Sequence, residues 1–246
     1  MKIVINPAYA VLKSFITKIP VLFEQEGELV YIARNQLRQY SVEGYDVIVK
    51  RYKQPHFINR IAYTYIRPSK AKRAYEYAFK LLELGINSPA PIAYIEQYKS
   101  GLLTYGYFIS IYEKKYSVIR DFMSGIQTDD SLLKELSYYI SELHNKGVLH
   151  LDMSPGNILY YKEGTNYNFT LIDINRMQFL PTVSKIKRFK SFKRLAENES
   201  VLTTIAKIYA EASGMDEKET ITEINRYSTN FFSAGKRSKK TNDSES

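Results

Sequence analysis

Short apolar and β-branched runs, separated by polar turns, follow one another along the first half of the chain from residue 29. Glu43 and Gly44 stand between two of these runs and predict a tight turn between antiparallel strands. The runs that predict strands here are 29–32, 37–42 and 46–52. We therefore expect a small antiparallel sheet early in the fold.

A helical period replaces this pattern at residues 69–84. Apolar residues recur there every three or four positions, Ser69 is a candidate N-cap, and Gly85 is placed to end the helix. The other elements predicted in this half are a short helix at 9–16, ending before Pro20, and strands at 91–96 and 107–112. Residues 1–112 are thus predicted to form an N-terminal lobe, an antiparallel sheet with one Glu-bearing helix.

The second half is mostly helical in pattern. Residues 131–146 gather their leucines on one face, and Gly147 follows as a C-cap. Strands are predicted at 158–161 and 169–172, and helices at 195–212 and 217–231. Residues 235–246 are polar and charged, which predicts a disordered tail. The whole pattern is that of an α+β protein whose second lobe, at residues 113–234, is mostly helical.

Composition indicates a globular protein with anionic partners. Of the 246 residues 44% are apolar, and 35 Lys and Arg against 26 Asp and Glu give a net charge of +9. This charge suits nucleotide phosphates, an acidic lipid surface or nucleic acid, and nucleic acid has no other support. The absence of cysteine excludes disulfides and thiolate sites. No apolar run reaches the ~18 residues of a membrane span, and residues 1–20 lack an unbroken apolar segment, so we expect a cytoplasmic protein.

One loop has the residue pattern of phosphoryl transfer. It reads His150-Leu151-Asp152-Met153-Ser154-Pro155-Gly156-Asn157, and an apolar strand ending in Asp173 follows. A His, an Asp two residues on, an Asn five further and an Asp after a strand is the layout of a kinase catalytic loop and its metal-binding Asp. Asp152 is therefore the candidate catalytic residue, and Asn157 and Asp173 are candidate Mg²⁺ ligands. The competing interpretation is a capped loop in which Asp173 only forms a turn. We expect His150 to brace the loop rather than to react.

An upstream lysine and a helical glutamate complete the set expected for ATP. Lys50 ends the run Val47-Ile48-Val49-Lys50, which matches a strand-borne phosphate-binding lysine, although Lys53 on the same run is an alternative. Glu76, in the following helix, is the expected ion-pair partner that would hold Lys50 on the α- and β-phosphates, with Glu83 as its competitor. The predicted cofactors are ATP and Mg²⁺.

The glycine-rich loop that covers the phosphates in protein kinases is missing from the sequence. Arg34, Asn35 and Gln36 stand between the first two strands of the predicted sheet, and neither G-x-G-x-x-G nor a Walker A motif occurs. A loop of larger residues would therefore have to cover the phosphates.

A basic segment follows the predicted metal-binding Asp. Residues 185–194 hold six basic residues, with Ile186, Phe189 and Phe192 at threefold spacing. Such a stretch could meet an anionic lipid-linked substrate at a membrane surface. The alternative, a solvated helix face whose aromatic residues pack on the lobe, is equally compatible with the sequence.

These residues resemble those of the bacterial lipopolysaccharide kinase family, small atypical kinases that phosphorylate Kdo or heptose of the inner core. The resemblance runs from about Leu29 into the C-terminal helices. Its most telling segment is Ile172-Asp173-Ile174-Asn175-Arg176-Met177-Gln178, which looks like the family's Asp-x-x-Arg-x-Gln form. The other segments that carry it are 47–53, the helix with Arg73 and Glu76, 84–91, and 150–157.

The resemblance implies a two-lobed protein-kinase-like fold and an ATP-dependent kinase acting on a sugar hydroxyl of a lipopolysaccharide core precursor, at the cytoplasmic face of the inner membrane. It implies Lys50 and Glu76 on the nucleotide, Asp152 as catalytic Asp, and Asn157 and Asp173 on Mg²⁺. Leu151 replaces the Arg of regulated protein kinases, so activation-loop control is not expected. The alternatives are a small-molecule or RIO-like protein kinase, or a pseudokinase that binds nucleotide without turnover.

Overall fold

The chain forms two compact units. The computed structural model describes residues 1–32 and 35–243, with side chains up to residue 236. Unit 1 is Met1–Lys114 together with Asp173–Asn175, and unit 2 is Lys115–Ile172 together with Arg176–Ser246. The division after Lys114 lies close to the one predicted after residue 112. The short return of Asp173–Asn175 to unit 1 has no counterpart in the prediction.

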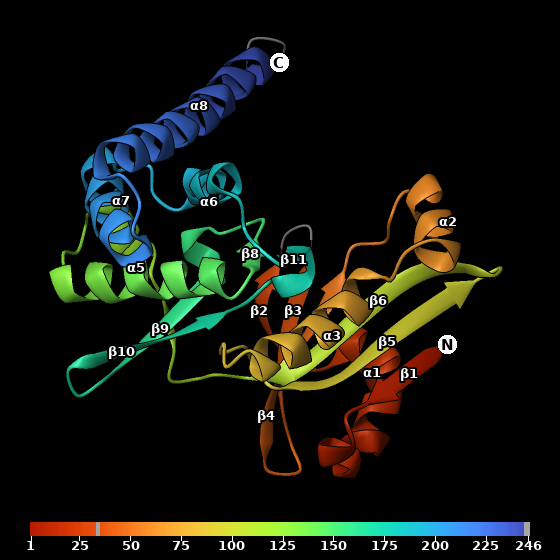
Figure 1. The fold of residues 1–246 in the computed structure, drawn as a ribbon. Helices are drawn as coiled ribbons and strands as arrows, with labels where there is room; N and C mark the ends of the chain where they lie inside the picture. Colours follow the sequence, from red (N-terminus) through yellow and green to blue (C-terminus); the bar gives the residue numbers. More distant parts are fainter. Residues whose placement is uncertain (33–34, 244–246) are drawn as a thin grey trace. The chain divides into compact units, whose positions relative to one another are not determined.

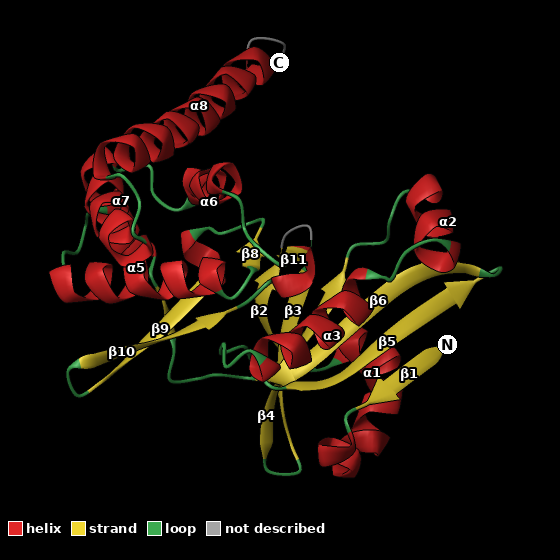
Figure 2. Cartoon of the chain, in the orientation of Figure 1, coloured by secondary structure: helices red, strands yellow, loops and turns green. Residues whose placement is uncertain are grey.

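Unit 1 is built on a six-stranded antiparallel sheet in the order β1-β5-β6-β4-β3-β2 (Figures 1 and 2). Its strands are β1 (Lys2–Ile5), β2 (Glu28–Ile32), β3 (Gln36–Val42), β4 (Tyr45–Tyr52), β5 (Pro91–Lys99) and β6 (Leu102–Ile111). The predicted turn between β3 and β4 is confirmed, because Val42 pairs with Tyr45 across Glu43 and Gly44. Both turn residues have positive φ, the backbone form that suits a two-residue hairpin.

Three α-helices and one 3₁₀-helix accompany this sheet. They are η1 (Pro7–Leu12), α1 (Lys13–Gln25), α2 (Phe57–Tyr65) and α3 (Lys70–Glu83). Ser69 caps α3 as predicted, since its side chain accepts a hydrogen bond from Lys72 N. On α1, Ile16, Ile19 and Phe23 are buried in one core with the sheet residues Val47 and Ile109.

The expected end of the first helix before Pro20 is wrong. The helix α1 runs through Pro20 to Gln25. A proline inside a helix removes one backbone hydrogen bond, a cost of about 3 kcal/mol. The buried residues on both sides, Ile16 and Phe23, show that packing against the sheet offsets this cost.

Unit 2 is mainly helical and carries two small sheets. Its helices are α4 (Arg120–Ser124), α5 (Asp130–Asn145), η2 (Pro155–Asn157), α6 (Lys185–Ser191), η4 (Phe192–Arg194), α7 (Glu199–Ser213) and α8 (Glu217–Asp243). Its strands are β7 (Ser117–Val118), β8 (Val148–His150), β9 (Ile158–Glu163), β10 (Asn166–Leu171) and β11 (Met177–Phe179). They form the sheets β10-β9-β7 and β11-β8. A further 3₁₀-helix, η3 (Ile174–Arg176), spans the change from one unit to the other.

The last helix is longer than its apolar pattern predicts. It continues through residues 235–243, where composition predicts a disordered tail, and residues 244–246 of that tail lie outside the described residues. Lysine and arginine are good helix formers, so a polar, basic sequence can extend a helix that has already been nucleated.

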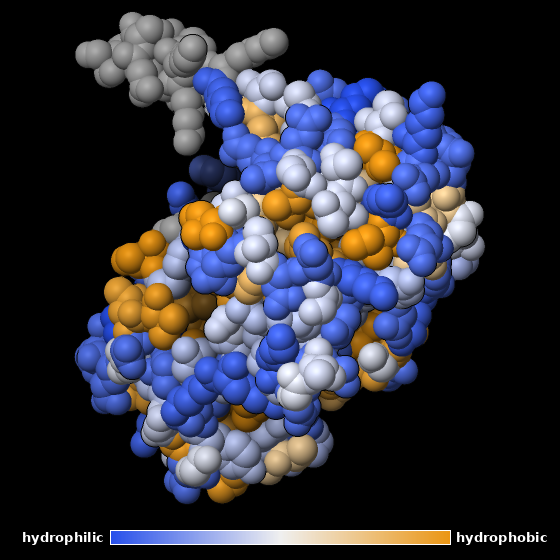
Figure 3. Space-filling view, turned by 90° about the vertical axis from the view of Figure 1, so that its left-hand side faces the viewer, coloured by the Kyte–Doolittle hydropathy of each residue, from blue (hydrophilic) through white to orange (hydrophobic). Residues whose placement is uncertain are grey.

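The surface shown in Figure 3 is dominated by hydrophilic residues, with hydrophobic ones gathered in patches between them. Across the described part of the chain, no helix combines the length and the apolar character needed to cross a membrane.

Candidate active site

The strand that leads into the predicted catalytic loop of unit 2 is preceded by a glycine that no other residue could replace without strain. Gly147, between α5 and β8, has φ of 76°. A Cβ at this position would lie 2.0 Å from Leu180 O, and the Leu180 N–H donates to Gly147 O at 2.8 Å. The close approach of these two backbone segments fixes the direction in which β8 delivers His150.

His150 braces the loop, as predicted. The ring is buried, and its Nδ1 accepts a hydrogen bond from the Asp152 N–H at 3.1 Å. Its Nε2 lies 3.1 Å from Ile172 O, so the tautomer that satisfies both contacts carries the proton on Nε2. Ile172 is the last residue before Asp173. The imidazole thus ties the loop to the strand end that precedes the predicted metal-binding Asp.

Asp152 lies between two guanidinium groups. Its Oδ1 accepts a hydrogen bond from Arg194 Nη1, and its Oδ2 lies 3.6 Å from Arg176 Nη1. The Asp152 side chain is 15% exposed. Arg176 belongs to the Asp-x-x-Arg-x-Gln segment, whereas Arg194 was not singled out from the sequence. Its only signal was membership of the basic segment 185–194.

Asn157 is held by the same loop. Its Nδ2 donates to Asp152 O at 2.8 Å, and its backbone carbonyl accepts from the Ile172 N–H at 3.0 Å. Because the nitrogen end of the amide is used by the loop, the other end presents Oδ1, a hard oxygen of the kind that Mg²⁺ prefers. The amide orientation therefore fits the metal role predicted for Asn157.

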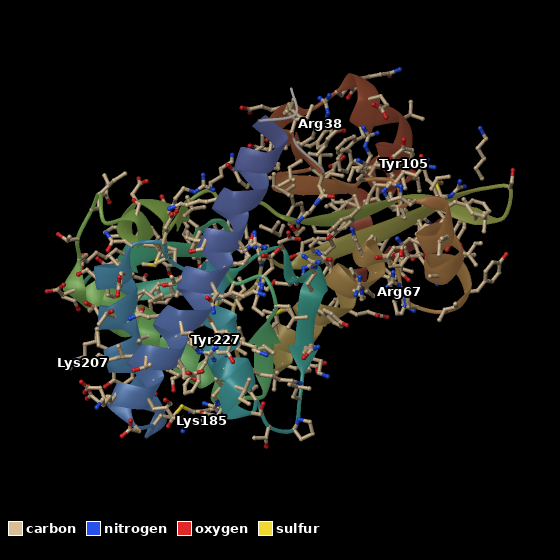
Figure 4. The ribbon with its side chains drawn as sticks, turned by 90° about the horizontal axis from the view of Figure 1, so that it is seen from above. Arg38, Arg67, Tyr105, Lys185, Lys207 and Tyr227 are labelled. Atoms are coloured by element: carbon tan, nitrogen blue, oxygen red, sulfur yellow. The ribbon has the colours of Figure 1, made fainter. Side chains whose placement is uncertain are left out.

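The basic segment 185–194 packs on its own unit. Phe189 and Phe192 are buried, whereas Ile186 is exposed. Two of its lysines contact α8: Lys185 pairs with Glu219, and Lys190 Nζ lies 5.5 Å from the ring centroid of Tyr227 (Figure 4). Of the two interpretations of this segment, the geometry supports aromatic packing on the lobe.

In unit 1, Lys50 and Asp173 form an ion pair although they lie 123 residues apart in sequence. Lys50 Nζ is 2.5 Å from Asp173 Oδ1, and the lysine side chain is only 13% exposed. Lys53 follows the end of β4 and is exposed. Its backbone N–H donates to Asn35 Oδ1 at 3.3 Å. Of the loop predicted to cover the phosphates, Arg34 lies outside the described residues. The geometry therefore supports Lys50 over Lys53.

A polar cluster supports Asp173. The aspartate has φ of 54°, an uncommon backbone form for a residue with a side chain, and Asn175 Nδ2 donates to its Oδ1 at 2.6 Å. Tyr52 is buried and hydrogen-bonds Asn175; burial, together with the negative charge of Asp173, raises its pKa well above the usual value, while Arg73 opposes this. Among the described residues, Arg73 Nε is buried without a hydrogen-bond partner. Tyr52 and Asn175 were not predicted as site residues.

Glu76 does not join Lys50 here. Its Oε1 lies 3.6 Å from Lys72 Nζ one helical turn away, and its side chain is 48% exposed. Among the described residues, the ion-pair partner of Lys50 is Asp173. The role of Glu76 on the nucleotide stays a prediction.

The described residues include no group of three His, Cys, Asp or Glu arranged to hold a metal ion. Magnesium in phosphoryl-transfer enzymes is commonly held by one or two carboxylates together with substrate phosphates, so the Asp173 carboxylate and the Asn157 amide are each of a ligand type that this ion takes.

Comparisons with known proteins agree with the residue pattern. The model of the lipopolysaccharide kinase (Kdo/WaaP) family matches residues 35–208. Among solved structures, WaaP in complex with acyl carrier protein is similar with a TM-score of 0.63 and 13% identity, covering 94% of this chain and 100% of that one. At this identity the likeness concerns the fold, and it confirms the predicted kinase-like α+β class. The comparison with curated proteins gives no match.

Proposed function

Because the chain belongs to the lipopolysaccharide kinase (Kdo/WaaP) family, we propose that it transfers the γ-phosphoryl group of ATP to a sugar hydroxyl, of Kdo or heptose, in the lipopolysaccharide inner core. The ion pair of Lys50 with Asp173, at 2.5 Å, is the observation that carries this proposal. It brings the strand-borne lysine of a kinase pattern to the carboxylate of the Asp-x-x-Arg-x-Gln segment, and packing alone gives no reason to pair them in a largely buried position.

In this proposal Lys50, Asp173 and Asn157 act on the nucleotide and its metal ion. Lys50 neutralises charge on the phosphates, Asp173 offers Mg²⁺ a carboxylate oxygen, and Asn157 offers it an amide oxygen. When bound, Mg²⁺ supplies charge neutralisation at the phosphates. Asn175, which is itself hydrogen-bonded to Tyr52, holds the Asp173 carboxylate in one orientation, and this lowers the cost of organising the site when the nucleotide binds.

The unit 2 residues act on the acceptor. Asp152 accepts the hydrogen bond of the attacking hydroxyl and orients its oxygen, the role of the catalytic-loop Asp in kinases. Arg194 and Arg176 flank this carboxylate and present guanidinium groups, which suit an anionic group such as the transferred phosphoryl. A sugar acid such as Kdo carries a carboxylate that the same groups could bind.

Labelled ATP tests the proposal directly. Purified protein is incubated with core oligosaccharide acceptors, and transfer is compared for wild type and Asp152→Ala. We expect label on the sugar with wild type, and no transfer by the variant at an ATP·Mg²⁺ affinity within a few-fold of wild type. Label on protein but not on oligosaccharide would refute the sugar acceptor. Unchanged turnover of the variant would show that Asp152 is misassigned.

Mass spectrometry of the core oligosaccharide from a deletion strain identifies the acceptor. A phosphate missing from one sugar would name the position. A core with all its phosphates would contradict the proposal.

A further inference from the structure

Helix α2 packs on the sheet of unit 1 through its polar side. Arg60 Nε donates to Leu103 O at 2.9 Å, and the Leu103 N–H donates to Thr64 Oγ1 at 3.0 Å. Arg60 and Thr64 are four residues apart and therefore lie on the same side of the helix. Leu103 is near the start of β6, so the helix sits beside the β5–β6 hairpin (Figure 1).

Three apolar residues of α2 lie on a different side of the helix from this contact, whereas Phe57 lies near Arg60. Ile58, Ile61 and Tyr65 recur at the spacing of a second helical side, and no residue of α2 is buried. Ile58 is 80% exposed and Tyr65 71%, and Ile66, directly after the helix, is 80% exposed. Helices on the surface of a globular protein normally turn their apolar side toward the core, whereas α2 exposes apolar residues to solvent. Several strongly exposed apolar side chains on and directly after one helix indicate an interaction surface.

Positive charge predominates in the chain segment that carries this face. Residues 53–70 include four Lys and Arg and no Asp or Glu. Arg67 follows α2, is exposed, and lies 4.4 Å from the ring centroid of Tyr63 (Figure 4). A cavity of about 730 Å³ beside the helix is lined by Arg60 and Lys99, and Asp and Glu are missing among its described lining residues. Apolar residues within a basic surround match the chemistry of an anionic lipid surface.

We propose that α2 docks the protein on the surface of a bilayer that contains anionic lipids. Ile58, Tyr65 and Ile66 enter the headgroup boundary, and Arg67 with its basic neighbours meets the lipid phosphates. The basic segment 185–194 is less suited, because Phe189 and Phe192 are buried and because Lys190 and Lys193 lie against aromatic rings of α8. The docking does not depend on the proposed phosphoryl transfer and is measured without it.

Vesicle sedimentation tests this surface with the full chain. Wild type is expected to bind vesicles that contain phosphatidylglycerol, and to bind phosphatidylcholine vesicles weakly. Ile58→Ser together with Ile66→Ser is expected to weaken binding about tenfold, because two exposed side chains lose their contact with the lipid. Arg67→Gln is expected to weaken binding to the anionic vesicles only and to reduce its salt dependence.

Matched controls separate the docking surface from general effects. Ile126 in unit 2 is also 80% exposed, so Ile126→Ser should leave binding unchanged, as should Lys207→Gln for charge. Both α2 substitutions are at exposed positions, and unchanged circular dichroism verifies folding. The proposal is overturned if wild type does not bind, or if Ile126→Ser weakens binding as much as the Ile58→Ser and Ile66→Ser pair does.

Loss of binding with Ile186→Ser alone would overturn it as well, and would assign docking to segment 185–194 instead. A dimer in sedimentation velocity that the α2 pair abolishes, without vesicle binding, would identify a second copy as the partner.

Discussion

Lys50 and Lys53 are three positions apart in sequence: Lys50 lies within β4, and Lys53 lies just beyond its end. Lys50 is largely buried and pairs with Asp173, whereas Lys53 is exposed beyond the strand. We expect Lys50→Met to lower the rate of phosphoryl transfer by about 100-fold or more, because a preorganised charge on the phosphates is lost. Lys53→Met is the matched control and should retain the rate within about twofold. Equal losses in the two variants would contradict the assignment of Lys50.

Arg194 is expected to act on catalysis by positioning Asp152. Its Nη1 bonds Asp152 Oδ1, and its guanidinium carbon lies 5.4 Å from the ring centroid of Phe231. Arg194→Gln should lower kcat about tenfold or more, with a smaller change in the KM for ATP. Arg194→Lys should restore part of the loss, because it retains one charged donor.

Steady-state kinetics of these variants, with Lys193→Gln as the control, measures the effect of Arg194. The control removes a neighbouring charge whose Nζ lies 5.8 Å from the same Phe231 ring. A change in thermal stability without a change in kcat would assign Arg194 a structural role only.

At the residue scale, the motif residues could be predicted and their supports could not. Asp152, Asn157 and Asp173 have fixed spacing within one loop and one strand, so a sequence pattern finds them. Tyr52 reaches Asn175, and Arg194 reaches Asp152, through contacts between distant segments, which no local spacing indicates. The role of Glu76 stays a prediction, because a helical glutamate can pair with a residue one turn away, here Lys72, as readily as with a distant one.

The connection from α5 to β8 has no room for a side chain at Gly147. A Cβ there would meet Leu180 O at 2.0 Å, and the φ of 76° is itself unfavourable for other residues. We expect Gly147→Ala to lower the free energy of unfolding by about 3 kcal/mol or more. Gly214, which ends α7 with φ of 63° and has nothing within 4 Å of its Cβ position, is the control.

Urea denaturation of both glycine variants separates strain from clash. Gly214→Ala should cost about 1 kcal/mol, the conformational penalty alone. If the two substitutions lowered the free energy of unfolding equally, the close contact with Leu180 O would not contribute to the loss of stability in Gly147→Ala.

Elements with a clear apolar period were predicted, and those without it were missed. The helices α3, α5 and α7 have a buried apolar stripe, and their sequences show it. The helix α2 has no buried residue, so its pattern could not be attributed to a core contact. The strand β1 has four residues and depends on pairing with β5, a contact that a local pattern does not contain.

At the scale of the whole molecule, the least predictable feature is the return of Asp173–Asn175 to unit 1. Sequence order places these residues inside the second half, between β10 and β11. Their membership of unit 1 depends on the Lys50 ion pair and the Tyr52 contact, both of which involve β4. A boundary drawn from sequence patterns assigns continuous stretches of chain to each lobe. It therefore cannot assign three residues of the second half to unit 1 when they contact that unit through side chains.

The stability of unit 2 is expected to depend on the protonation of His144. The ring lies between Tyr209 OH at 2.8 Å and Ser191 Oγ at 3.3 Å, and burial, with the nearby Arg188, lowers its pKa from 6.5 to about 3. The unfolded chain therefore takes up a proton first on acidification, so the stability is complete above pH 6.5 and is lost as the pH falls toward 3. Between about pH 6.5 and about pH 4.5 this group should cost wild type about 2 kcal/mol. The glutamine of His144→Gln has no titratable group. The free energy of unfolding of this variant, measured by urea denaturation over the same pH range, should therefore fall by about 2 kcal/mol less than that of wild type. Parallel curves for the two proteins would mean that the folded state accepts the proton on His144 as readily as the unfolded chain does.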